Sequence, residues 1–294
     1  RRMADGQDSS IVLEIPGAQA DAFDLGVFAA VTITPDLSKP DSGVVPVRVE
    51  VTPAKLQTVR LGGGVTLDTL KADVHGIVGW ESRNFLGGMR RFSVDFQPAL
   101  VFVPLRINNF VPPEHFLPAM KLRSELRQPG FIEGKTVGFI RPRLSATPIL
   151  LKTDTGEDDP IIGYGEAFAA VGGRRPFGRR LLVELSQNVQ YAKPFPYVGE
   201  MDPALADVLL LYPELVTTLD FRDDKIHPHR GFLLGNTFQT ALGIDGRDVK
   251  TQPEARGYIP LGDRVTLAGR ATVGLLFPQN YGQDIAESIQ RDFD

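Results

Sequence analysis

The sequence predicts a mostly β protein made of long antiparallel strands, and three observations support this fold class. Apolar and polar residues alternate with a period of two, as in residues 120–127, where Met, Leu, Ser and Leu alternate with Lys, Arg, Glu and Arg. Successive side chains of a strand point to opposite faces, so the pattern gives one apolar and one charged face. The alternating runs are also long, and turn-rich linkers separate them.

The length of these runs favours strands that cross a bilayer. Residues 179–193 and 265–277 exceed the ~5–6 residues common in soluble sheets and reach the ~9–11 that a tilted transmembrane strand needs. About eleven such segments are expected, at residues 58–67, 71–82, 90–105, 119–128, 135–149, 161–173, 179–193, 207–223, 231–243, 248–260 and 264–277. Residues 202–215 begin with Asp and Pro, so a short helix is an alternative there.

The composition limits the other classes of protein. Hydrophobic residues make up 42% of the chain, and the longest apolar runs fall well short of the ~18 residues of a spanning helix. The net charge of −4 provides no basic field for nucleic acid. Without cysteine, the chain has neither disulfides nor thiolate metal sites.

A charged turn at residues 219–231 joins two strand-like runs. The residues that define it are Asp220, Arg222, Asp223, Pro228 and Gly231. Proline and glycine are typical of positions where a chain reverses and leaves its ladder. A solvated hairpin loop is the plain alternative for this segment.

Two further segments are rich in glycine. The first, at the start of the long strands, comprises Leu61, Gly62, Gly63, Gly64 and Val65. The second follows the next predicted strand and contains Arg83, Asn84, Gly87 and Gly88. Upstream of both, the sequence LGVF at residues 25–28 precedes two shorter strand-like runs at 30–37 and 44–52.

These motifs, in this order, resemble the BamA/TamA-type outer-membrane assembly proteins, also called bacterial surface antigens. The resemblance covers about residues 21–276 and implies an antiparallel transmembrane β-barrel, of which residues 56–294 supply about eleven of roughly sixteen strands. Residues 1–55 then resemble the C-terminal part of an α+β POTRA (polypeptide-transport-associated) domain. The family's VRGF-type loop motif is missing from the sequence, so we expect the chain to be a piece of a longer protein.

The search for catalytic chemistry gives no candidate. The sequence contains no GxSxG, HExxH or P-loop motif. His227 and His229 flank Pro228 in the charged turn, and two histidines without a third ligand are a weak metal signal. We therefore expect no enzyme, no cofactor and no metal site.

The first glycine-rich segment carries the functional hypothesis. Consecutive glycines weaken a strand, because they offer no side chain for packing and lose the most entropy on ordering. A bulge or a close backbone contact would also explain them. The family resemblance implies instead a lateral gate, at which an open strand edge pairs with an incoming strand.

The resemblance also implies a location and partners. The barrel would lie in the bilayer of the bacterial outer membrane, with the N-terminal part in the periplasm. Its partners would be unfolded outer-membrane client proteins, with accessory lipoproteins or periplasmic chaperones bound through the POTRA-like part.

Two other functions stay open on the sequence. A passive porin-like or two-partner-secretion-type channel would share the strands but conduct ions steadily. A soluble all-β binding protein would share the alternation, because its apolar face would then be a core.

Overall fold

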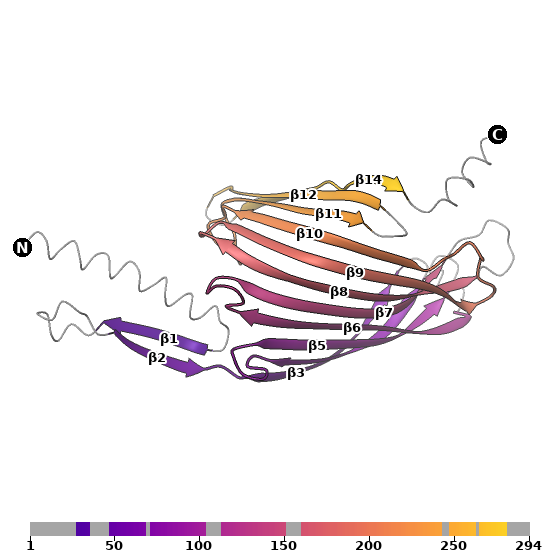
Figure 1. Cartoon of the computed structure of the whole chain (residues 1–294), viewed down its shortest axis with the longest axis horizontal. Helices are drawn as coiled ribbons and strands as arrows, with labels where there is room; N and C mark the ends of the chain where they lie inside the picture. The colour runs from indigo at the N-terminus through magenta and orange to yellow at the C-terminus, as the bar shows by residue number, and fades with distance from the viewer. Residues whose placement is uncertain are drawn as a thin grey trace, which may run out of the picture.

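The computed structural model describes residues 28–35, 47–68, 71–103, 113–150, 160–242, 247–262 and 265–280 (Figure 1). Over these residues the chain is all β and forms two separate antiparallel sheets, one of two strands and one of twelve. Within the described segments, no helix is long and apolar enough to cross a membrane.

The small sheet is a hairpin of β1 (Phe28–Pro35) and β2 (Val47–Pro53). It corresponds to the two short strands expected in the POTRA-like part. Residues 1–27, which would supply the helical component of an α+β POTRA-like part, lie outside the described residues, so the α+β character of this part stays a prediction. β2 ends four residues before the large sheet begins at Gln57, and the hairpin lies beyond the end of the sheet at which β3 starts (Figure 1).

The large sheet is a meander in which almost every strand pairs with its neighbours in the sequence. Its strands are β3 (Gln57–Leu67), β4 (Ala72–Ser82), β5 (Arg91–Val103), β6 (His115–Pro129), β7 (Val137–Leu150), β8 (Ile161–Phe177), β9 (Leu181–Val198), β10 (Val208–Asp220), β11 (Gly231–Leu242), β12 (Arg247–Pro260), β13 (Thr266–Thr272) and β14 (Leu275–Asn280). β8 and β9 have 17 and 18 residues, which confirms that the strands are long. The sheet is curved and open, with β3 at one edge (Figure 1).

The single strand expected at residues 264–277 is wrong. The chain forms two strands there, β13 and β14, and both pair with β12. The interruption at Val273 lies opposite Pro253, whose carbonyl accepts the Val273 N–H at 3.1 Å. Because proline has no N–H to return to the ladder, the pairing breaks at this position.

The helix considered at residues 202–215 is also wrong. The Asp202 carboxylate accepts the Ala204 N–H at 2.8 Å, and its carbonyl accepts the Leu205 N–H at 3.0 Å. These bonds close one turn, and the chain then enters β10 at Val208. An aspartate that satisfies its own backbone in this way favours a turn over a helix interior.

The two faces of the sheet differ in chemistry. The face that carries Glu81 and its cross-strand neighbours Ser93 and Glu125 is called the charged face. The opposite face, called the apolar face, carries the row of neighbours Val78, Phe96, Leu122, Leu144, Ala167, Tyr191 and Leu209. On the apolar face, Val78 and Leu144 are 49% and 44% exposed.

The few buried side chains of the sheet lie mainly on the charged face. Among them are Val101, Leu117, Phe139, Ala170 and Asn188, each at most 6% exposed. Side chains crowd together on the concave side of a curved sheet, so the charged face is the inner one. This distribution is the reverse of a soluble β-sandwich, in which the apolar face is covered.

The two ends of the sheet also differ. At the end where β3 begins, called the turn end, the strands are joined by residues 83–90, 130–136, 178–180, 221–230 and 261–265. The Arg83 N–H donates to the Leu56 carbonyl at 2.8 Å, which ties the first of these turns to the entry of β3. The small hairpin therefore joins the sheet at its turn end.

Candidate functional site

The glycine-rich segment lies in the middle of the edge strand β3. Gly62, Gly63 and Gly64 stand opposite Ile77, Gly76 and His75 of β4. The register runs without a shift along the whole of β3, so the alternative of a bulge is wrong. Among the described residues β3 pairs only with β4, and the backbone groups on its outer edge form no ladder.

The glycines differ in what surrounds them. A Cβ on Gly62 would lie 3.9 Å from the Ile77 Cβ, an ordinary contact, whereas a Cβ on Gly64 would lie 2.8 Å from His75 Nε2. The His75 ring is held in place by Asp73, whose Oδ1 is 2.7 Å from His75 Nδ1. Gly64 therefore accommodates a side chain of β4, while Gly62 leaves β3 without a cross-strand contact that a larger residue could make.

The charged turn joins β10 to β11 and is closed by its own carboxylates. Asp220 forms a two-pronged contact with Arg222, at 2.9 Å to Nε and 2.8 Å to Nη2. The Asp223 carboxylate accepts the backbone N–H groups of Arg230, His229 and Asp224 at 2.9–3.1 Å. These hydrogen bonds, that of Arg230 first, lower the pKa of the Asp223 carboxyl.

Asp224 completes the turn in the same manner. It accepts the N–H groups of His227 and Ile226, and these bonds lower the pKa of its carboxyl. The histidines of the turn thus contribute backbone donors. No group of three His, Cys, Asp or Glu residues suited to a metal exists in the described part of the chain.

Gly231 ends the turn and has a left-handed backbone, with φ of 110°. A Cβ there would overlap the Phe221 carbonyl and stand 2.9 Å from the Arg222 Cα. Only glycine fits this position without strain. Pro228 lies within the turn, where its missing N–H has no ladder to interrupt.

The second glycine-rich segment, which contains Arg83, Asn84, Gly87 and Gly88, forms the turn between β4 and β5. Arg83 Nε lies 3.1 Å from Glu81, and the Asn84 carboxamide oxygen accepts the Met89 N–H at 3.0 Å. Gly87 and Gly88 both have left-handed backbones. This turn and the charged turn share the turn end of the sheet, but strands β6 to β9 separate them, so the structure does not join the predicted segments in one site.

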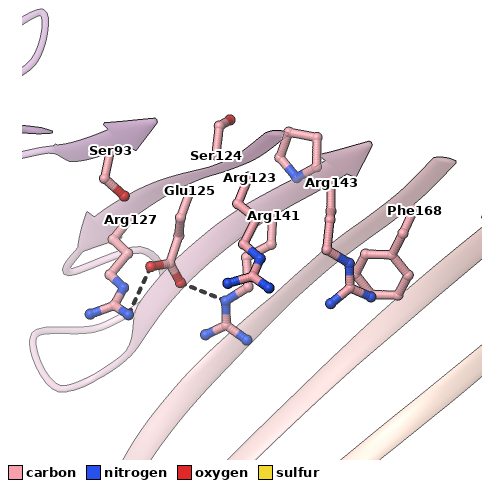
Figure 2. A pocket seen from close by; sticks show the side chains of 9 residues that line it. Ser93, Arg123, Ser124, Glu125, Arg127, Arg141, Arg143 and Phe168 are labelled. Carbon is pink, nitrogen blue, oxygen red and sulfur yellow. Dashed lines mark hydrogen bonds and ion pairs between the residues drawn. The ribbon is translucent and has the colours of Figure 1, made fainter. Parts of the chain in front are cut away.

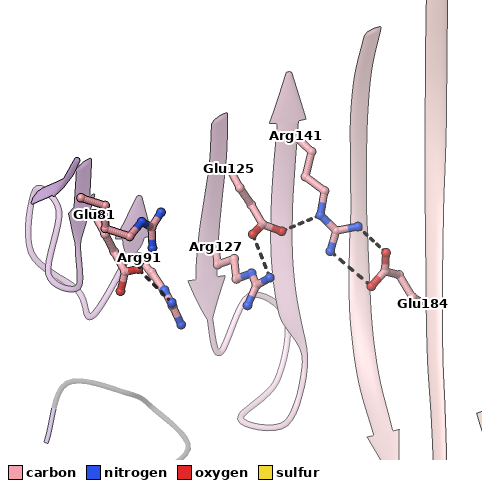
Figure 3. Close-up of polar contacts among 7 residues, drawn as sticks. Glu81, Arg91, Glu125, Arg127, Arg141 and Glu184 are labelled. Carbon is pink, nitrogen blue, oxygen red and sulfur yellow. Dashed lines mark hydrogen bonds and ion pairs between the residues drawn. The ribbon is translucent and has the colours of Figure 1, made fainter. Parts of the chain in front are cut away.

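Sequence reasoning missed an ion-pair network on the charged face (Figure 3). Glu125 contacts Arg127 at 2.8 Å and also pairs with Arg141, which in turn forms a two-pronged contact with Glu184. Nearer the edge, Glu81 lies 3.1 Å from Arg91. The charges were visible in the sequence at alternate positions, but pairing them required the register between strands.

Aromatic rings gather near both ends of the sheet. At the turn end, Trp80, Phe85 and Phe92 form a cluster with centroids 4.8–6.2 Å apart. At the other end, Phe102 and Phe116 meet edge to face at 5.3 Å. The distance from Phe92 to Phe102 along β5 is about 34 Å, or roughly 26 Å across a bilayer at the ~40° tilt typical of outer-membrane barrels.

That span matches the apolar band of such barrels, which is about 25 Å tall and flanked by aromatic residues. Between the two rings, the residues of β5 on the apolar face are Val94, Phe96, Pro98 and Leu100. The band is therefore free of charge along this strand.

No known protein family and no curated protein matches the sequence. Among solved structures, the chain is similar to BamA from Haemophilus ducreyi, in a crystal structure lacking POTRA domains 1–3. The TM-score is 0.60 at 10% sequence identity, over 90% of this chain and 49% of that chain. The chain thus spans about half the length of the BamA structure and has the fold of part of a BamA-type β-barrel.

Proposed function

We propose that this chain is part of an outer-membrane β-barrel protein that folds and inserts client barrels at the edge of β3. The observation that carries the proposal is a glycine-rich first strand, β3, in a BamA-like sheet, because such a strand would pair weakly with the strand that closes the barrel. An unpaired strand edge can template an incoming strand through its backbone N–H and C=O groups.

The exposed apolar face supports a location in a lipid bilayer. A soluble protein rarely exposes a contiguous apolar surface of this extent, whereas the outer surface of a barrel must be apolar. The aromatic clusters near the two ends of the band support the same location. In the outer membrane, the turn end would face the periplasm, because three of the longest connections, residues 104–114, 151–160 and 199–207, leave the opposite end and longer loops mark the extracellular side of such barrels.

This orientation places the β1–β2 hairpin in the periplasm. β2 exposes Val47, Val49 and Val51 at 46–56%. We propose that this POTRA-like part contacts clients, accessory lipoproteins or periplasmic chaperones before a client reaches the edge of β3.

A steady channel is the second candidate, and the charged inner face favours it. Ion pairs of Glu125, Arg141 and Glu184 would line the lumen of a closed barrel and suit water and ions. Conductance in planar bilayers separates the two candidates. A steady open pore without client insertion supports the channel, and client insertion without steady conductance supports assembly.

Disulfide crosslinking tests the edge of β3 directly, because the chain has no cysteine of its own. Leu61→Cys on β3 would be paired with an unfolded barrel client that carries one cysteine in its last strand. Phe96→Cys is the matched control, since Leu61, Val78 and Phe96 lie in one row of the apolar face. We expect crosslinks from Leu61→Cys alone. Equal crosslinking from both positions, or none, would contradict the proposal.

A further inference from the structure

Beside the ion-pair network, the charged face holds a recess of about 290 Å³ with an excess of arginine (Figure 2). The charged residues of its lining are Arg123, Glu125, Arg127, Arg141 and Arg143. Four guanidinium groups therefore meet one carboxylate. Figure 2 shows Arg123, Arg141 and Arg143 directed to the same side of the sheet.

The neighbouring carboxylates do not remove this excess. Glu125 is shared between Arg127 and Arg141, and Glu184 binds Arg141 from β9. Glu166 reaches Arg143 only at 3.6 Å, and the Arg143 guanidinium lies 4.2 Å from the centroid of the Phe168 ring. That stacking fixes the plane of the guanidinium and leaves its N–H groups for another acceptor.

Arg123 is the least compensated of the four. Its cross-strand neighbour on β5 is Asp95, but Asp95 is engaged by Arg60 at 2.7 Å. Its neighbour on β7 is Arg143, another cation. Like charges directly opposite each other on neighbouring strands are unfavourable. Among the described residues, no carboxylate lies within ion-pair distance of Arg123.

We infer that this recess is an oxyanion-binding site, with Arg123 and Arg143 as the principal donors. Two opposed guanidinium groups can bind one phosphate or carboxylate group through parallel N–H donors, and the bound anion relieves their repulsion. The ligand is an anionic group, either of a small phosphate compound or of an acidic polypeptide segment in the lumen. This site goes beyond client assembly, because binding an anion requires no client.

Two probes, inorganic pyrophosphate and tetraglutamate, distinguish the sources of the anion. Each would be titrated by calorimetry into the purified protein in neutral detergent and low-salt buffer. We expect one or both to bind, and the tighter probe identifies the source. The affinity should fall as salt is added, because the contacts are ionic.

Two variants localise the binding. Arg123→Gln should lower the affinity for the preferred probe by about tenfold or more, as expected for loss of a charged hydrogen-bond donor. Lys121→Gln is the matched control, since it removes the same charge from the same face of β6 outside the recess. Heat-modifiable migration on SDS gels checks that both variants fold. Absence of binding in the unaltered protein, or equal weakening by both variants, would overturn the site.

Discussion

The imidazole of His75 occupies the space that a side chain on Gly64 would need. His75 Nε2 would lie 2.8 Å from a Cβ at Gly64, and Asp73 holds the other ring nitrogen at 2.7 Å. The first two strands of the large sheet are thus matched in shape at this position, although β3 itself contributes only backbone. The contributions of Gly64 and His75 to stability should therefore be coupled.

A double-mutant cycle tests the coupling between Gly64 and His75. Gly64→Ala should displace the imidazole from Asp73, whereas the same change in a His75→Ala background should meet empty space. Residues in contact show coupling energies of about 0.5–3 kcal/mol, so the two changes should not be additive. The free energy of unfolding in urea, measured after folding into lipid vesicles, gives all four values. Additive effects would contradict the contact.

The apolar face should tolerate no charge if it contacts lipid. Leu144→Arg places a cation on this face and should destabilise the inserted protein by about 2–4 kcal/mol near the bilayer midplane. Ser145→Arg is the control, because the next residue of β7 points to the charged face. Urea titration of vesicle-folded protein measures both. A soluble binding protein predicts the opposite, since Leu144 is 44% exposed and arginine would meet water there.

Gly231 should be the least replaceable residue of the charged turn. Gly231→Ala forces a Cβ against the Phe221 carbonyl at a φ of 110°, and such strain costs on the order of 1–3 kcal/mol. Gly257→Ala, in the neighbouring strand β12, provides the control, since a Cβ there meets nothing within 4 Å. Loss of heat-modifiable migration at a lower temperature for Gly231→Ala alone is the expected result. Equal behaviour of the two variants would show that the turn relaxes without cost.

The charged turn should loosen in acid. Backbone N–H donors lower the pKa of Asp223 and Asp224 in the folded protein relative to about 4 in an unfolded chain. A lowered folded pKa stabilises the turn above the unfolded value, and this stabilisation is lost as pH falls through the folded value. Amide hydrogen exchange at His229 and Arg230 should therefore become faster below about pH 4, after correction for intrinsic rates.

Asp223→Asn provides the comparison for that experiment. An asparagine keeps an acceptor oxygen but cannot titrate, so the acid-dependent change at Arg230 should become smaller. An unchanged acid response in the variant would show that another group controls the turn.

The alternation of residue types was enough to place most strands of the large sheet, because a period of two is strong when one face meets an apolar medium. The break between β13 and β14 was not predictable from residues 264–277 themselves. Its cause is Pro253 on the neighbouring strand, and a single strand's sequence does not show what lies opposite it.

At the candidate site, too, local features were predictable from the sequence, whereas contacts between strands were not. Gly231 and the acidic turn are local features, so their residue types indicated a turn directly. The network of Glu125, Arg141 and Glu184 joins β6, β7 and β9 across β8, so its contacts depend on the registers of three strand pairs. The sequence motifs resemble those of the BamA/TamA-type proteins over most of the chain. The structural similarity to BamA supports this resemblance at the level of fold alone.

Client insertion through β3 is the central claim, and one variant tests it most directly. Gly62→Val should gain packing against Ile77, because its Cβ has room at 3.9 Å, and should stiffen the edge strand. Gly76→Val, whose Cβ would lie 3.7 Å from Pro98, makes the same substitution one strand inward, on the apolar face, and controls for the added valine itself. The measurement is the rate at which proteoliposomes containing each variant insert an unfolded barrel client. We expect slower insertion for Gly62→Val alone, and normal insertion by that variant would contradict a gate at β3.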